Sequence, residues 1–431
     1  MIPKRISAAL LHSMTAGVTP RTGLPYIAIG RQGEIRALVG DLDNIEAGGS
    51  AFRLICGRYG SGKSFLLGLV RGNAMDRGFA VMDADLSPER RLTGTRGQGL
   101  ATYRELMTNL STKASPEGGA LPAVLARYIS GLQLEAAREL AAAPGDPRVA
   151  EAVERKVLEA VMGFSGLVQG FDFAAVITHY YRGHIAGDEA MKQAALRWLR
   201  GEYRTKTEAK KELPVGSIVE DETWYDALKL MAAFLRVAGY KGLLVCLDEA
   251  VNLYKITHTP TREANYEKLL TIFNDCMQGR LNGLGFLMGG TPQFVEDTRR
   301  GLFSYEALRS RLAANRYAKE GLVDTTGPVL QLATLTPEEI YALLTRIQAI
   351  HGEHYGWQPA ITAEELLAFL QEQVGRMGAD ALLTPREVIR DFVGLLNVMQ
   401  QNPGTGFADL VVRQQSAAAA APRDDFAEFT L

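Results

Sequence analysis

A glycine-rich loop between two apolar segments is the feature that most constrains this chain. The stretch GRYGSGKS, residues 57–64, follows the apolar run FRLIC and leads into FLLGLV. It matches the pattern G-x-x-x-x-G-K-[ST] in the context that this pattern requires, a strand before the loop and a helix after it. Glycines let the backbone bend so that its N–H groups and the helix N-terminus face a phosphate, which a Cβ would obstruct. The sequence therefore predicts a phosphate-binding loop, the alternative being a glycine turn with a surface lysine.

The residues of this loop are candidates for binding a nucleotide. Lys63 can reach the β and γ phosphates, and the hydroxyl of Ser64 can ligate Mg²⁺. We therefore expect ATP and Mg²⁺ as cofactors. The expected nucleotide-binding residues of the loop are Gly57, Arg58, Tyr59, Gly60, Ser61, Gly62, Lys63, Ser64 and Phe65.

Two carboxylates follow a second apolar strand, in the stretch GLLVCLDEA. Asp248 and Glu249 then lie at the carboxyl edge of a parallel sheet, which is where such sheets bind ligands. Asp248 is placed to hold Mg²⁺, and Glu249 to orient and deprotonate a water that attacks the γ-phosphate. The alternative is an acidic helix cap after a strand. Beside the glycine loop, the pair favours ATP hydrolysis.

The apolar runs predict an α/β P-loop core with helical additions. Strands are predicted at SAFRLICG, FAVMDADL, GLLVCLDEA, LGFLMGG and GPVLQLA, in a βαβ order typical of a parallel sheet. Between the second and third strands, at about 87–240, only helical patterns occur, which predicts a large helical insertion. We expect an ATPase core at 1–330, a helical lid domain at 331–402 and a flexible tail at 403–431.

Composition excludes few function classes. Lys and Arg number 47 against 49 Asp and Glu, so no global charge draws the chain to nucleic acid or membrane. No apolar run approaches the roughly 20 residues that span a bilayer, and no signal peptide is evident. The three cysteines lie singly in apolar segments, which is typical of reduced core residues. We expect a cytoplasmic protein without a membrane partner.

Together these motifs resemble those of the AAA+ ATPases, in the branch of origin-recognition and Cdc6-like proteins. IGRQGEI, residues 29–35, looks like the segment that lines the adenine pocket in that branch, which implies roles for Gly30 and Arg31. GGT at 289–291 ends the fourth strand, where the family carries its first sensor, so Thr291 is expected there. The family more often has asparagine at this position.

Two arginines take their expected roles from the same resemblance. LRSRL, residues 308–312, resembles the box whose arginine reaches the γ-phosphate of a neighbouring subunit. This implies an oligomer with shared sites and Arg311 as the finger, with Arg309 in reserve; the alternative is a solvated basic helix face. LTPREVI resembles the second sensor, which places Arg386 over the nucleotide, unless it is a capped surface arginine.

A narrower resemblance includes the insertion. DADLSPERRLTG, TYRELMTNL, RWLRGE and LDEAVNLY, in this order, look like the ATP-binding proteins of bacterial phage-defence and helicase gene clusters, such as the BrxD-type ATPases of BREX (bacteriophage exclusion) systems. This implies a loader or remodeller associated with DNA, with a helicase or another defence subunit as partner. The chain departs from origin-recognition proteins by ending before a winged helix would fit, and Ala250 stands where a further acidic residue is usual.

Two weaker signals and two rival functions stay open. Basic residues surround Trp198 and Tyr203, and others follow the second strand at SPERRLTGTRG. Both groups could contact nucleic-acid phosphates, and solvated helix faces and loops explain them as well. His351 and His354 have a spacing that can pair two imidazoles, but no third zinc ligand is evident. The rivals are a nucleotide-dependent scaffold with little turnover and a small-molecule kinase.

Overall fold

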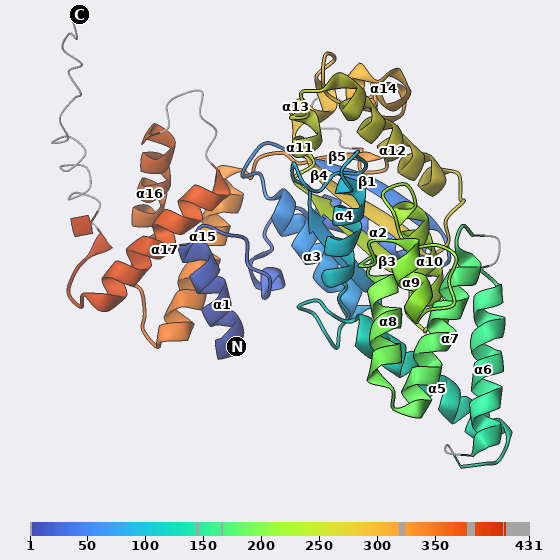
Figure 1. Ribbon diagram of the computed structural model, residues 1–431. Helices are drawn as coiled ribbons and strands as arrows, with labels where there is room; N and C mark the ends of the chain where they lie inside the picture. Colours follow the sequence, from blue (N-terminus) through green and yellow to red (C-terminus); the bar gives the residue numbers. More distant parts are fainter. Residues whose placement is uncertain are drawn as a thin grey trace, which may run out of the picture. The chain divides into compact units, whose positions relative to one another are not determined.

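The computed structural model of the protein describes residues 2–143, 146–164, 167–318, 324–376, 384–407 and 409–410. Two compact units are present (Figure 1). One, the helical unit, comprises Met1–Gln32, Arg58–Gly68 and Leu332–Leu431. The other, the sheet unit, comprises Gly33–Gly57 and Leu69–Gln331.

Five parallel strands form the core of the sheet unit, in the order β2-β3-β4-β1-β5. Their bounds are β1 (Ser50–Cys56), β2 (Ala80–Asp85), β3 (Leu243–Asp248), β4 (Leu284–Gly290) and β5 (Val329–Gln331). Nearly every position of β1, β3 and β4 is buried, as in a sheet covered on both faces by helices. The α/β class and the five strands predicted from the apolar runs are therefore confirmed.

The register of the strands places their carboxyl ends at the same height in the sheet. Cys56 of β1 lies opposite Gly290 of β4 and Gln331 of β5. Asp85 of β2 lies opposite Asp248 of β3. The loops that follow β2 and β3 therefore leave the sheet side by side, as do those that follow β1 and β4.

The described chain between β2 and β3 is predominantly helical. Its helices are α4 (Gln98–Thr108), α5 (Leu121–Glu139), α6 (Pro147–Met162), α7 (Gly170–Ala186), α8 (Glu189–Leu199), α9 (Lys206–Glu212) and α10 (Trp224–Val237). Helices α5 to α8 pack consecutively against one another (Figure 1). The indoles of Trp198 and Trp224 are buried in this region and donate to the carbonyls of Ser217 and Leu92, each at 2.8 Å.

Other helices cover the sheet and follow its strands. They are α2 (Gln32–Glu46), α3 (Lys63–Asp76), α11 (Val251–Tyr254), α12 (Thr259–Met277), α13 (Pro292–Glu296) and α14 (Glu306–Leu312), with a 3₁₀ turn at Leu302–Ser304. The three cysteines are buried and unbridged, in agreement with their sequence setting. Burial raises the pKa of the Cys246 and Cys276 thiols, so these are inert core residues.

The helical unit packs helices from both ends of the chain. They are α1 (Lys4–Thr15), α15 (Pro337–Tyr355), α16 (Ala363–Arg376) and α17 (Pro385–Gln401), with a 3₁₀ turn at Leu24–Ile27. Helix α1 packs on α15 and α17. Leu10, Leu344 and Phe392 are fully buried between them. Apolar faces that none of these helices could bury alone thus form one core.

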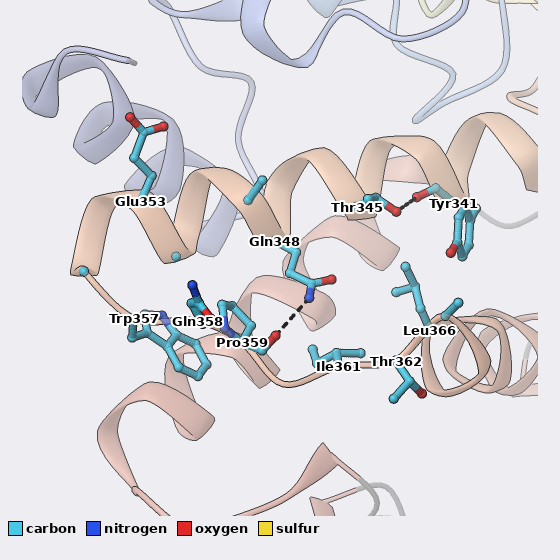
Figure 2. A pocket seen from close by; sticks show the side chains of 14 residues that line it. Tyr341, Thr345, Gln348, Glu353, Trp357, Gln358, Pro359, Ile361, Thr362 and Leu366 are labelled. Atoms are coloured by element: carbon cyan, nitrogen blue, oxygen red, sulfur yellow. Dashed lines mark hydrogen bonds between the residues drawn. The ribbon is translucent and has the colours of Figure 1, made fainter.

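A groove of about 810 Å³ runs along α15 in the helical unit (Figure 2). Trp357, Pro359 and Ile361 of the loop after α15 line one side of it. The Gln348 amide crosses to this loop and donates to the Pro359 carbonyl at 3.2 Å.

Among the described residues, no helix has both the length and the apolar character needed to cross a membrane.

Candidate functional site

The glycine loop links the last residue of β1, Cys56, to the first residue of α3, Lys63. Gly60 and Gly62 have φ values of 77° and 94°, a left-handed backbone that favours glycine. Among the described residues, a Cβ on Gly62 would meet no atom within 4 Å, so its backbone faces open space. The Gly57 amide donates to the Gly290 carbonyl at 3.1 Å, which fastens the start of the loop to the end of β4.

Inside the loop, several donors lie near one carbonyl. The Arg58 carbonyl accepts from the Ser61 amide at 3.2 Å and from the Lys63 ammonium at 2.9 Å. The Ser61 hydroxyl is buried and has no hydrogen-bond partner within the described residues. A left-handed glycine beside open space, a lysine and a helix N-terminus with Ser64 in its first turn fit a nucleotide phosphate. Of these groups, the Ser64 hydroxyl is the one that can ligate Mg²⁺, which binds through few protein ligands together with phosphate oxygens.

Arg31 reaches this loop from the segment before α2. Its Nη2 donates to the Ser61 carbonyl at 2.9 Å and to the Ala333 carbonyl at 2.6 Å. Gly30 and Arg31 have φ values of 69° and 64°, and a Cβ on Gly30 would stand 2.6 Å from an oxygen of Glu339. The two residues predicted for the adenine pocket thus lie beside the phosphate loop and the start of α15.

Arg386 also meets the loop. It lies in the first turn of α17, and its Nη1 donates to the Tyr59 hydroxyl at 3.0 Å. Its guanidinium carbon is 5.2 Å from the centroid of the Tyr59 ring, within the range of cation–π attraction. Thr384 caps α17 and packs on Gly60. The N-termini of α3 and α17 therefore both lie at the loop, which concentrates positive potential there.

The two carboxylates end β3 in the sheet unit. Asp248 is the last strand residue, and its Oδ1 accepts from the Glu249 amide at 2.8 Å. Glu249 has a φ of 55°, and its side chain is exposed. A non-glycine residue in this conformation costs about 1–3 kcal/mol, so the surrounding contacts must hold it there. One such contact is the Ala250 amide, which donates to the Gly289 carbonyl at 3.0 Å.

An asparagine outside the set of predicted site residues supports this turn. The Asn252 amide nitrogen Nδ2 donates to the Leu86 carbonyl at 2.7 Å, and its backbone amide donates to the Glu249 carbonyl at 2.9 Å. The Leu86 amide in turn donates to the Asp248 carbonyl at 3.0 Å. These bonds tie the segment after β2 to the segment after β3. The one available signal was an amide side chain three residues after Glu249.

Thr291 and Arg311 have well-defined contacts in the same unit. Thr291 directly follows β4 and caps α13, its hydroxyl accepting from the Phe294 amide at 3.2 Å. Arg311 is exposed, and it donates to the Asn274 side chain at 3.1 Å and to the Ala307 carbonyl at 2.7 Å. The roles of Thr291 and Arg311 stay predictions.

The reserve candidate for the finger, Arg309, also lies on α14. The Arg309 side chain is 55% exposed and lies 3.8 Å from a carboxylate oxygen of Glu306. Within the described ranges, no cluster of three or more His, Cys, Asp or Glu side chains has the arrangement to hold a metal ion. A cation bound at the phosphate loop would therefore depend on the Ser64 hydroxyl and on phosphate oxygens.

The aromatic residues of the weaker signals are structural. Trp198 and Tyr203 are both 1% exposed, so neither ring can stack on a base. The guanidinium of Arg197 lies 4.3 Å from the Tyr203 ring centroid and pairs with Glu208 and Glu212. The charge of Arg197 is therefore paired within the insertion, by two acids of α9.

The two histidines are likewise engaged in the helical unit. Both ring nitrogens of His351 have partners, the Trp357 indole and the Asn397 side chain, each at 3.0 Å. The His354 Nδ1 is 2.8 Å from the Ser7 hydroxyl. A zinc pair at these two residues is therefore excluded in this structure.

Comparison with known proteins bears on the same residues. The family described as BREX system ATP-binding protein BrxC/D matches residues 2–415, which includes the glycine loop, the carboxylate pair and the insertion. Comparison with curated protein sequences gives no match. Because the family match spans nearly the whole chain, the protein belongs to the BrxC/D family of BREX system ATP-binding proteins.

Proposed function

We propose that the protein is a cytoplasmic AAA+ ATPase that converts ATP and water to ADP and phosphate. The loop residues 57–64 would hold the phosphates of ATP, with Lys63 on the β and γ phosphates. Ser64 and Asp248 would hold Mg²⁺, which would neutralise charge that develops on the phosphate oxygens. Thr291 would orient the attacking water.

Glu249 is the proposed general base, and its fixed backbone is the observation that carries the proposal. The hydrogen bond from its amide to Asp248 Oδ1, 2.8 Å long, links the base to the proposed metal ligand. As the water oxygen bonds to the γ-phosphorus, its proton passes to the Glu249 carboxylate and the bond to the ADP oxygen breaks. The exposed side chain can exchange that proton with solvent afterwards.

The experiment compares Glu249→Gln with wild type by phosphate release and by equilibrium binding of ATP. We expect hydrolysis to fall about 10²- to 10⁴-fold, because the amide cannot accept the proton, while ATP still binds. Glu263→Gln, which changes an exposed glutamate of α12, is the matched control and should hydrolyse like wild type. Equal hydrolysis by wild type and Glu249→Gln would remove Glu249 as the base. Equally slow turnover in both would favour the rival, a nucleotide-dependent scaffold.

The wider role follows from the family and from exposed arginines. We propose an oligomer in which Arg311 of one subunit completes the ATP site of the next, and in which the helical segment 331–402 acts as the lid. The bound nucleotide would then determine the lid angle and the contact between subunits. These changes would load or remodel a helicase or another BREX subunit on DNA. Stimulation of wild-type hydrolysis by duplex or single-stranded DNA tests the DNA association.

A further inference from the structure

Tyr59 makes a contact that a phosphate loop does not require. Its side chain is 71% exposed, although it lies between two of the loop glycines. The Arg386 guanidinium nevertheless covers its ring at 5.2 Å and donates to its hydroxyl at 3.0 Å. Backbone N–H groups suffice to bind a phosphate, so the contact with Arg386 is additional to phosphate binding by the loop.

Arg386 needs a support of this kind. A cation in the first turn of a helix is opposed by the positive end of the helix dipole. A free arginine side chain also loses about 2 kcal/mol of rotamer entropy when a ligand fixes it. Contact with a ring face and one hydroxyl offsets both costs before the ligand arrives, which is preorganisation.

The guanidinium keeps further donors while it rests on Tyr59. Arginine has five N–H groups, and the Tyr59 hydroxyl accepts from Nη1. Within the described residues, the Arg386 side chain contacts Tyr59 through this hydrogen bond and through the ring. The backbone beneath is fixed as well, since Thr384 at the start of α17 packs on Gly60. Loop and helix therefore present the guanidinium together.

We propose that Tyr59 is a positioning residue that holds Arg386 at the phosphate loop and so couples ATP binding to helix α17. The inference rests on the proposed ATP binding at this loop and on the role expected of Arg386 as the second sensor, which contacts the nucleotide. It assigns to Tyr59 a task distinct from touching ATP itself. Arg386 binds the phosphates in its stacked position, and Tyr59 sets that position.

A double-mutant cycle tests the coupling. Tyr59→Ala, Arg386→Ala and the double variant are compared with wild type by binding of the non-hydrolysable analogue adenosine β,γ-imidotriphosphate and by kcat/KM for ATP. We expect Tyr59→Ala to weaken analogue binding about tenfold, from the lost cation–π contact and charged hydrogen bond. In the Arg386→Ala background the same change should have less than about a twofold effect.

Conservative variants separate positioning from folding. Tyr59→Phe keeps the ring and loses the acceptor, so its loss should lie between wild type and Tyr59→Ala. Tyr317→Ala is the matched control, because Tyr317 of the sheet unit is also 71% exposed and stacks with Arg316, at 4.9 Å. It should bind the analogue like wild type.

The outcomes are distinct. Independent losses from Tyr59→Ala and Arg386→Ala would overturn the proposal and place Tyr59 directly on the nucleotide. If wild type released no phosphate, only the proposed hydrolysis would be contradicted. The double-mutant cycle would still be measurable, because binding of the analogue does not require turnover. Unchanged binding by Tyr59→Ala would overturn the positioning role outright.

Discussion

Gly60 of the phosphate loop and Thr384 of α17 lie in direct contact. An ideal Cβ on Gly60 would stand 2.7 Å from the Thr384 Cβ, which is closer than side-chain atoms approach, and the φ of Gly60 is 77°. Any larger residue at position 60 therefore strains its own backbone and pushes the N-terminus of α17. The loop can carry its left-handed turn here only with glycine.

Gly60→Ala should lower both stability and ATP affinity. The left-handed alanine costs about 1–2 kcal/mol and the overlap with Thr384 adds to this, so we expect thermal unfolding to shift down by several degrees. Gly72→Ala is the control, because Gly72 lies inside α3 and its Cβ would meet nothing within 4 Å. That change should stabilise by up to about 1 kcal/mol. Similar stability of the two variants would contradict the packing described.

Asp221 caps a helix from 122 residues away. Its carboxylate accepts from the amides of Gly94 at 2.9 Å, Gly99 at 2.6 Å and Leu100 at 3.0 Å, the last two in the first turn of α4. Asp221→Ala leaves these amides unpaired, and we expect a loss of about 2–4 kcal/mol in urea unfolding. Asp76→Ala, at a side chain that is 75% exposed, should change stability by less than about 0.5 kcal/mol. Equal losses would show that the cap contributes nothing.

Protonation of His351 should destabilise the helical unit. The Trp357 indole can only donate, so the His351 Nδ1 accepts and the imidazole is neutral, with Nε2 donating to Asn397. Burial lowers the pKa of His351 from 6.5, and the charge of His354 lowers it further, against the hydrogen bond to Asn397. The unfolded chain then binds the proton more readily, so stability is complete above about pH 7 and falls as pH drops below 6.5.

The measurement is unfolding free energy between pH 7.5 and 5.5. His351→Gln should lose the part of the pH slope that His351 causes, although it is less stable at pH 7.5. His12→Gln, at an exposed histidine of α1, should keep the wild-type slope. A slope unaffected by His351→Gln would assign the acid sensitivity to other groups.

Mixed subunits test the shared site. Arg311→Ala lacks the proposed finger and Lys63→Ala lacks the phosphate contact, so each alone should be inactive in phosphate release. In an equimolar mixture, some interfaces join an intact loop to an intact finger, and part of the activity should return. Replacing Arg311→Ala by Arg309→Ala in the mixture decides between the two arginines. Activity that stays at the level of the separate variants would contradict a site shared between subunits.

Local patterns were sufficient for the sheet and the loop. Apolar runs of strand length marked all five strands, and the spacing from Gly57 to Ser64 marked the loop, because both signals lie within a few residues. Contacts between distant segments could not be read in this way. The left-handed turn at Arg31 and its bonds to Ser61 and Ala333 depend on how α15 packs.

Burial was the other unreadable quantity. Trp198 and Tyr203 sit among basic residues, which in the sequence alone is typical of a nucleic-acid surface. Both rings are buried, and the acids that pair with Arg197, Glu208 and Glu212, come from the later helix α9. The sequence showed that the local charge is positive, but it did not show which side chains are buried.

At Glu249, the left-handed backbone favours a residue for stability that the proposed chemistry does not allow. Glycine would adopt its φ of 55° without strain, so Glu249→Gly is a substitution that relaxes the turn while it deletes the carboxylate. A search for thermostable variants would therefore favour glycine here, whereas a selection for the proposed ATP hydrolysis would reject it. Under the proposed mechanism, residue 249 is a position where the most stable residue and the active residue differ.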